Sequence, residues 1–218
     1  MGRKVHPIGF RIAVTRGWDS LWFADPKRFT ALLEEDVKIR DFLKNLLKEA
    51  LVDRVEIDRT RQELKLLIHS AKPGIIIGRG GTGIEDLSKK VKNKFFAGKR
   101  VKLSINVKEV QNASLCAQVV GLQVAADIEK RMPFRRVMKG TIERVLKAGA
   151  LGVKISISGR LNGSEIARRE MIAQGKIPLH TLRADIDFAS VTARTIWGAI
   201  GIKIWINRGE VFEKGKKE

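Results

Sequence analysis

The stretch Gly74-Ile-Ile-Ile-Gly-Arg-Gly-Gly-Thr-Gly-Ile-Glu85 decides which fold this chain is expected to adopt. An apolar run falls into the segment Gly78-Arg79-Gly80-Gly81, and hydrophobic residues resume after it. Glycine permits positive φ angles and lets another molecule approach the backbone closely. The arginine inside the loop adds a positive charge, which indicates a phosphate group as the ligand.

The charge of the whole chain points to a polyanionic partner. Its 218 residues contain 43 Lys and Arg against 24 Asp and Glu, a formal net charge of +19. Repulsion among so many like charges destabilises a compact fold unless a polyanion neutralises them. A basic membrane-surface protein is the other common source of such an excess. No apolar run approaches the roughly 18 residues of a spanning helix, so we expect nucleic acid rather than a membrane as partner.

The residues that usually carry catalysis or bind metals are sparse. Cys116 is the only cysteine and lies in a helical apolar pattern, where a small core residue is more common than a nucleophile. His6, His69 and His180 are too far apart in sequence to form a metal-spaced pair. We therefore expect no cofactor and no metal. The absence of a signal-peptide core near the first residue favours a cytoplasmic protein.

Hydrophobic periodicity predicts an α+β chain with two folded domains. We expect a basic arm over 1–24, one domain over 25–110, a second over 111–212 and a polar tail over 213–218. In the first domain, a helix should begin at Asp25-Pro26 and extend to about residue 47, with a break near Glu35-Asp36. Strands at 55–58 and 64–68 should follow, then a helix over 84–95 and a strand over 101–107. Ile75–Ile77 fits either a strand or one helical turn.

The second domain begins with a helical pattern that is broken at Met132-Pro133. Strands are then expected at 151–157, 181–195 and 200–206, with a turn at Asn162-Gly163-Ser164 that leads into a short helix through Ile166. The isoleucines of the last strand alternate onto one face, which should be core. Lys203 and Trp205 lie on the other face, where an RNA or protein contact and simple exposure are equally plausible.

Basic residues concentrate behind the glycine loop and in the second domain. Residues 89–102 hold seven bases and no acid, and residues 131–147 hold six bases against Glu143 alone. On a helix, Arg135, Arg136 and Lys139 fall within one turn, where like charges destabilise each other. That crowding suggests an anion opposite them, although a solvated helix face is the simpler alternative.

The glycine loop has three interpretations. Gly78-Arg-Gly80-Gly-Thr-Gly83 matches the G-x-G-x-x-G of dinucleotide-binding enzymes, but Lys99 and Arg100 occupy the region where that fold needs an acid. A KH loop, which clamps about four nucleotides through its backbone, fits better. In that case a helix and two strands precede the loop, and a helix and a strand follow it, which is the type-two KH order. A tight turn without a ligand is the third possibility.

Several segments together resemble one family, the bacterial third protein of the small ribosomal subunit. They cover nearly the whole chain in order: Met1–Arg11, Glu35–Arg40, Pro73–Gly81, Pro133–Lys139, Ser158–Arg168 and Pro178–Asp187. The resemblance implies a type-two KH domain followed by a second α+β domain with a small, mostly antiparallel sheet. It also implies a structural role without catalysis.

The resemblance further implies a place in the head of the small subunit, on ribosomal RNA and at the messenger RNA entry channel. The implied neighbours are the tenth and fourteenth small-subunit proteins, with the fourth and fifth near the channel. Messenger RNA contacts are expected at Arg131, Arg135, Arg136 and Lys139. RNA contacts of the KH loop are expected at Gly78, Arg79, Gly80 and Gly81. Ribosomal RNA contacts are expected at Arg3, Lys4, Arg11, Lys89, Lys90, Arg160, Arg168, Arg169 and Arg183, some of which could instead pair with Glu165, Glu170 or Asp185.

Two rival functions stay open on the sequence alone. One is a free-standing KH regulator of RNA that never enters ribosomes. The other, less favoured, is a dinucleotide-dependent enzyme that uses the glycine loop.

Overall fold

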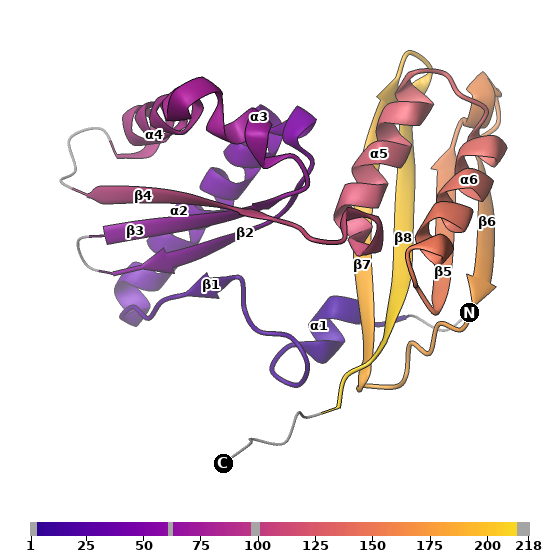
Figure 1. Ribbon diagram of the computed structural model, residues 1–218, viewed down its shortest axis with the longest axis horizontal. Helices are drawn as coiled ribbons and strands as arrows, with labels where there is room; N and C mark the ends of the chain where they lie inside the picture. Colours follow the sequence, from indigo (N-terminus) through magenta and orange to yellow (C-terminus); the bar gives the residue numbers. More distant parts are fainter. Residues whose placement is uncertain (1–3, 61–62, 97–100, 213–218) are drawn as a thin grey trace. The chain divides into compact units, whose positions relative to one another are not determined.

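A computed structural model describes residues 4–60, 63–96 and 101–212 (Figure 1). The chain forms two compact units. The first, which we call the KH unit, is built from the described residues between Trp18 and Gln111. The second, the carboxy-terminal unit, combines residues 4–17 with residues 112–212.

The KH unit has the element order expected of a type-two KH domain. Its elements are β1 (Ser20–Leu21), α2 (Pro26–Leu46), β2 (Val52–Arg59), β3 (Glu63–Ser70), α3 (Pro73–Ile77), α4 (Thr82–Phe95) and β4 (Lys102–Glu109). Apart from the short β1, a helix and two strands precede the glycine loop, and a helix and a strand follow it. Ile75–Ile77, which the sequence left open, is helical.

One sheet and two longer helices share the core of the KH unit. The strand order is β1-β2-β3-β4, with β2 and β3 antiparallel and β4 parallel to β3. Leu43 of α2 and Val91 of α4 are fully buried, and so is Ile57 of β2 in the same cluster. The apolar faces that the sequence pattern predicted therefore meet in one core, which holds the two ends of the glycine loop in place.

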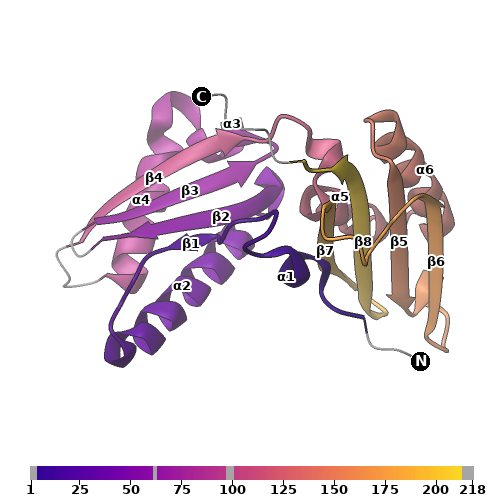
Figure 2. The ribbon, with the colours of Figure 1, turned by 90° about the horizontal axis from the view of Figure 1, so that it is seen from below.

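The carboxy-terminal unit is a four-stranded antiparallel sheet with two helices on one side (Figures 1 and 2). The strand order is β6-β5-β8-β7. Its elements are α1 (Pro7–Arg11), α5 (Ala117–Glu129), α6 (Phe134–Lys147), β5 (Gly152–Gly159), β6 (Arg168–Gly175), β7 (Ala184–Thr195) and β8 (Gly198–Glu210). The isoleucines of β8 are buried against α5 and α6, so the predicted core face is confirmed. The α+β fold class is confirmed as well.

The predicted break in the first long helix is wrong. Helix α2 continues through Glu35 and Asp36, because buried Asp36 has polar partners on the sheet side. Its carboxylate accepts hydrogen bonds from Trp22 Nε1 at 2.7 Å and from Arg59 Nη2 at 2.6 Å. A buried carboxylate with such donors costs far less than an unpaired one, so the helix has no need to turn it outward.

The stretch 1–24 does not behave as one separate arm. Residues 4–17 belong to the carboxy-terminal unit, whereas Trp18 to Ala24 belong to the KH unit, where β1 pairs with β2 in parallel. The division of the chain between the units therefore falls at residues 17 and 18, and again at 111 and 112.

Strand β6 was missed, and the short helix expected through Ile166 is absent. Leu161–Gly163 makes only one 3-10 turn, and Ile166 is 83% exposed in a bend before β6. Arg168–Gly175 then pairs with β5 along its whole length. Because β6 is an edge strand with mostly exposed side chains, its sequence has little of the alternation that marks a half-buried strand.

Candidate nucleic-acid interface

The glycine loop joins α3 to α4 through a single tight turn over Arg79–Gly81. Gly78, Gly80 and Gly81 have φ angles of +70°, +64° and +86°, which side-chain-bearing residues rarely adopt. A Cβ added to Gly80 or Gly81 would meet no atom within 4 Å, so these two positions face open space. The glycines therefore leave the main chain accessible from outside.

Among the glycines of this loop, Gly83 is under the greatest steric constraint, although it lies outside the four-residue motif. A Cβ there would lie 2.5 Å from the carbonyl oxygen of Ile76 and 3.0 Å from that of Ile77. Gly78 faces Gly83 across the turn, with its own Cβ position 3.0 Å from the Gly83 nitrogen. Close packing of α3 on the first turn of α4 therefore requires glycine at position 83. In the sequence, the presence of Gly83 was the available signal of this packing.

Apolar and cationic groups flank the loop. Ile75 and Ile77 of α3 are 51% and 38% exposed, which is unusual for isoleucine beside a core. Lys89 and Lys90 project from α4 into solvent, with Lys89 Nζ only 3.9 Å from an oxygen of exposed Asp86. The loop thus combines exposed backbone, exposed aliphatic surface and lysines, the groups that can hold a single strand of nucleic acid.

Helix α6 presents its bases on a rigid support. Phe134, Val137 and Met138 are buried in the core of the carboxy-terminal unit. On the opposite side, the predicted residues Arg135, Arg136 and Lys139 are all exposed. Arg131 is exposed just before the helix and has a φ of +62°. All four predicted messenger RNA contacts are therefore exposed on or just before α6.

Glu170 of β6 holds Arg135 in place. The Arg135 guanidinium donates from Nε and Nη2 to the two carboxylate oxygens at 3.1 and 3.0 Å. Arg168 Nε lies 3.4 Å from the same carboxylate. The hydrogen bond from Arg135 is the main reason that the pKa of Glu170 lies below its usual value. This carboxylate was considered in the sequence as a partner of the arginines, and it joins two of the predicted RNA-binding residues.

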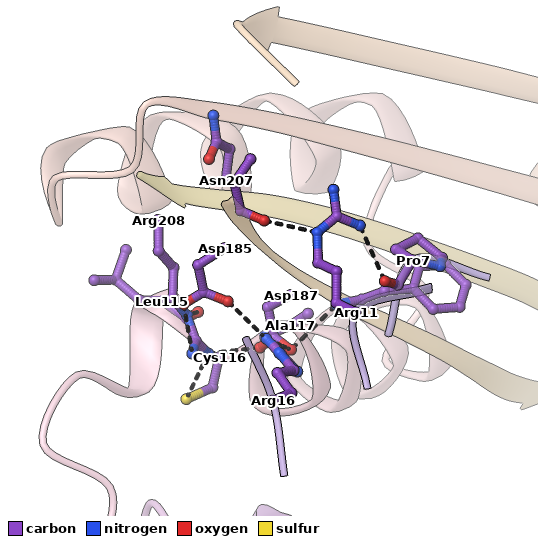
Figure 3. A network of polar contacts seen from close by, with 12 residues as sticks. Pro7, Arg11, Arg16, Leu115, Cys116, Ala117, Asp185, Asp187, Asn207 and Arg208 are labelled. Carbon is purple, nitrogen blue, oxygen red and sulfur yellow. Dashed lines mark hydrogen bonds and ion pairs between the residues drawn. The ribbon is translucent and has the colours of Figure 1, made fainter. Parts of the chain in front are cut away.

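Arg11 has a structural role that replaces the predicted ribosomal RNA contact. Its side chain is fully buried in the carboxy-terminal unit. Its guanidinium donates to main-chain carbonyls of Ala184 at 2.7 Å and Thr181 at 2.9 Å. It also donates to the carbonyl of Pro7 at 3.0 Å (Figure 3). Burial lowers the pKa of Arg11, but these carbonyls take up its donors, so none points toward a ligand.

Other predicted ribosomal RNA contacts differ in how far they are already engaged. Arg183 Nε lies 2.7 Å from a Glu210 carboxylate oxygen, and Arg160 donates to the carbonyl of Ser164 at 2.9 Å. Arg169 donates to the Ser156 hydroxyl at 2.9 Å, and this contact leaves its positive charge without neutralisation by a carboxylate. Lys4 is exposed, and Arg3 lies outside the described residues.

A charged network that sequence reasoning missed ties the amino terminus to the carboxy-terminal unit (Figure 3). Arg16 Nη2 lies 3.1 Å from carboxylate oxygens of both Asp185 and Asp187. Asp187 also accepts from Arg208 at 2.6 Å and from the first amide of α5, that of Ala117, at 2.8 Å. The two aspartates two positions apart, Asp185 and Asp187, were the only signal in the sequence, and a register shift of β7 after Asp185 places both against Arg16.

The enzyme alternative loses its structural basis. A dinucleotide-binding loop follows a strand directly, whereas the loop here follows helix α3. Among the described residues, no helix is long and apolar enough to cross a membrane.

Comparisons with known proteins agree with both units. A KH domain model matches residues 38–115, and a model of the ribosomal protein S3 C-terminal domain matches residues 124–206. The small ribosomal subunit protein uS3 of Syntrophomonas wolfei is 51% identical over 217 residues, covering 100% of this chain and 93% of the relative. The uS3 proteins of Pelotomaculum thermopropionicum and Bacillus thuringiensis (strain Al Hakam) are each 49% identical, covering 99% and 100% of this chain and 92% and 97% of theirs. The chain therefore belongs to the uS3 family of small ribosomal subunit proteins.

Proposed function

We propose that this chain binds RNA in the small ribosomal subunit and contacts messenger RNA through the exposed side of α6. Membership of the uS3 family makes it a structural ribosomal protein of the cytoplasm rather than an enzyme, and its KH domain makes it an RNA-binding one. The messenger RNA contact is the finer part of the proposal.

The arrangement of α6 carries that finer part. Arg135, Arg136 and Lys139 project from one side of a helix whose other side is buried, so their positions are fixed by the core. Glu170 pairs with Arg135 of these three, so it neutralises only part of this charge. A messenger strand that passes this surface would gain phosphate contacts without rearrangement of the fold.

The glycine loop supports a second RNA contact in the KH unit. Its open main chain and the exposed Ile75 and Ile77 suit a single strand held by backbone contacts and an apolar groove. We assign it to ribosomal RNA with Lys89 and Lys90, whereas α6 is assigned to the messenger.

The neighbours are part of the same proposal. The sequence resemblance supports contacts with the tenth and fourteenth small-subunit proteins, and proximity to the fourth and fifth at the entry channel. Cross-linking in intact small subunits, followed by identification of the linked proteins and RNA positions, tests each of these neighbours. Sedimentation tests the free-standing alternative, because a KH regulator would be found mostly outside the subunit fraction.

The double substitution Arg135→Ala/Arg136→Ala tests the messenger RNA contact. Binding of a single-stranded RNA should weaken, and the slope of log K against log salt should become shallower by about 1.4, because each lost phosphate contact on a single strand contributes about 0.7. Fluorescence anisotropy with a labelled oligouridine at several salt concentrations measures both quantities.

The matched control is Lys27→Ala/Arg28→Ala, two exposed residues of α2, which removes the same charge from the KH unit. We expect the control to change the slope much less. Equal slopes for the two double variants would mean that α6 contributes only net charge, and would contradict its role as a contact.

A further inference from the structure

The carboxy-terminal sheet has a face that no helix of the α5–α6 pair covers, and we call it the open sheet face. Because α5 and α6 both pack on the isoleucine side, every second residue of the four strands points the other way (Figures 1 and 2). Part of this face is covered: Ile186 and Asn207 are buried, and His6 of the amino-terminal segment packs on Phe188 with ring centroids 4.8 Å apart. The other residues that alternate onto the open sheet face are Lys154, Ser156 and Ser158 of β5, Arg169, Met171 and Ala173 of β6, Phe188, Ser190, Thr192 and Arg194 of β7, and Gly201, Lys203 and Trp205 of β8.

Positive charge gathers on this face without a balancing acid. Four of the residues just named are Lys or Arg, and none is Asp or Glu. Lys4, from the amino-terminal segment, adds a further charge close to Lys154. The pKa of Lys154 is lowered by burial and then by the nearby Lys4 and Arg169. Like charges are thus held together with no carboxylate between them, an arrangement that favours a polyanion opposite.

The side chains of the face are ordered by contacts among themselves. Phe188 and Trp205 pack with ring centroids 5.2 Å apart, and Lys154 Nζ lies 5.2 Å from the Trp205 centroid. The Arg169 Nε atom donates to the Ser156 hydroxyl at 2.9 Å. Two of the cations, Lys154 and Arg169, are therefore held against an aromatic ring and a hydroxyl group, which lowers the entropy cost of binding a ligand.

We propose that the open sheet face binds the phosphate backbone of a folded RNA segment, separate from the strand assigned to α6. Lys154, Arg169 and Lys203 would contact phosphates, while exposed Met171 and the edge of Trp205 lie against sugars or bases. A protein partner fits less well, because the centre of a protein interface is depleted of Lys and of charged residues in general. The inference rests on the proposed RNA-binding role and adds a second surface to it.

Charge removal on the full-length protein tests the proposal. The triple variant Lys154→Gln/Arg169→Gln/Lys203→Gln is compared with Lys27→Gln/Arg28→Gln/Lys44→Gln, three exposed bases of α2 in the KH unit. The probe is a labelled RNA hairpin whose stem is a 20-base-pair duplex. We expect the sheet variant to lose about 2 units of log–log salt slope, for three phosphates at roughly 0.7 to 0.9 each, and the control variant to keep the wild-type slope. Equal slopes in the two triple variants would overturn the proposal.

A photoreactive residue in assembled subunits separates RNA from protein as the occupant. Ser190 is exposed on the open sheet face, so it is replaced by p-benzoylphenylalanine. Adducts to ribosomal RNA support the proposal, whereas adducts to a neighbouring protein alone, or none, overturn it. The Arg135→Ala/Arg136→Ala variant separates this proposal from the messenger RNA contact. If the triple variant of the sheet has a shallower salt slope with the hairpin while Arg135→Ala/Arg136→Ala has no effect on RNA binding, only the messenger RNA contact is refuted.

Discussion

The KH unit and the carboxy-terminal unit present RNA-binding groups in different ways. In the KH unit, the accessible groups are main-chain atoms, exposed because Gly80 and Gly81 carry no side chain and face open space. In the carboxy-terminal unit they are guanidinium and ammonium groups, several of which are held by carboxylates such as Glu170. The first kind of site should be sensitive to an added methyl group, and the second to a changed charge.

The largest effect is expected where charge is buried, at Asp187 of the carboxy-terminal unit. Asp187→Ala would leave Arg16 and Arg208 without this partner and remove the acceptor for the Ala117 amide. Breaking a fully buried ion pair from one side typically costs about 3–5 kcal/mol. The cost here should lie at or below the lower end of that range, because Arg16 and Arg208 are partly exposed and keep Asp185 as a partner. Hydrogen exchange at the amides of α5 and β7 should report this loss of local stability.

Asp86→Ala is the control for Asp187→Ala, because Asp86 is an exposed acid of the KH unit with one long contact. Its effect should stay within about 0.5 kcal/mol. A loss at Asp187 no larger than that would show that the network contributes little to stability.

A single methyl group should produce the next largest effect, in the KH unit. Gly83→Ala places a Cβ 2.5 Å from the Ile76 carbonyl oxygen, so α3 and α4 must move apart. Such overpacking typically costs about 1–3 kcal/mol. Faster exchange at the amides of α3 and α4, with unchanged exchange in the carboxy-terminal unit, is the expected result.

Gly74→Ala adds the same methyl group to α3 at a position with no atom within 4 Å. It should leave exchange near the wild-type rate, within the range of about 0.5 kcal/mol typical of surface substitutions. Matching losses in the two variants would refute the steric account of Gly83.

Removing one charge should sharpen the role of Glu170. Glu170→Gln frees Arg135 and removes a negative charge that repels phosphate, so single-stranded RNA should bind tighter by about twofold to fivefold at low salt, the range of an exposed ion pair. The same effect should appear in the wild type as pH falls. Because the pKa of Glu170 is depressed, the pair persists above that pKa and is lost only below it.

Glu143→Gln is the matched control, because Glu143 is an exposed acid of α6 itself and the charge change is identical. An equal gain in affinity from both variants would mean that Glu170 acts through net charge alone, and not by holding Arg135.

The smallest effect is expected at Gly140, an exposed glycine in the middle of α6. A Cβ there meets no atom within 4 Å, so Gly140→Ala should stabilise the carboxy-terminal unit by about 0.5–1 kcal/mol through helix propensity. Gly149, just after α6, has equally open surroundings but a φ of +97°. Gly149→Ala should therefore destabilise the carboxy-terminal unit. If urea denaturation shows that both substitutions change the free energy of unfolding in the same direction, this account is contradicted.

Much of the fold could be predicted because local patterns were strong. The amphipathic helices and alternating strands of both units appear near the expected positions, and the type-two KH order is confirmed. The predictions failed where the local sequence signal is weak. Strand β6 is an exposed edge strand, and α2 continues through two acidic residues. In each case a distant partner decides the outcome: β5 pairs with β6, and Arg59 neutralises Asp36.

The candidate site was predicted unevenly for the same reason. The glycines and the bases of α6 are visible in the sequence as residue types at fixed spacing. Whether an arginine is available to a ligand is not visible, because it depends on which acceptors the fold brings near it. Arg11 and Arg135 look alike in sequence, yet one is fully buried among carbonyls and the other is exposed beside a carboxylate.

By itself, the sequence determined the basic character of this protein, its KH loop and its membership of the uS3 family, because charge, glycine spacing and hydrophobic period are local properties. Only the tertiary structure decided which bases are engaged inside the protein and which stand on an exposed face. Ion pairs and hydrogen bonds join residues far apart in the chain, such as Arg11 with Ala184 and Arg135 with Glu170. Strand pairing likewise decided that Lys154, Arg169 and Lys203, which are scattered through the sequence, share one face.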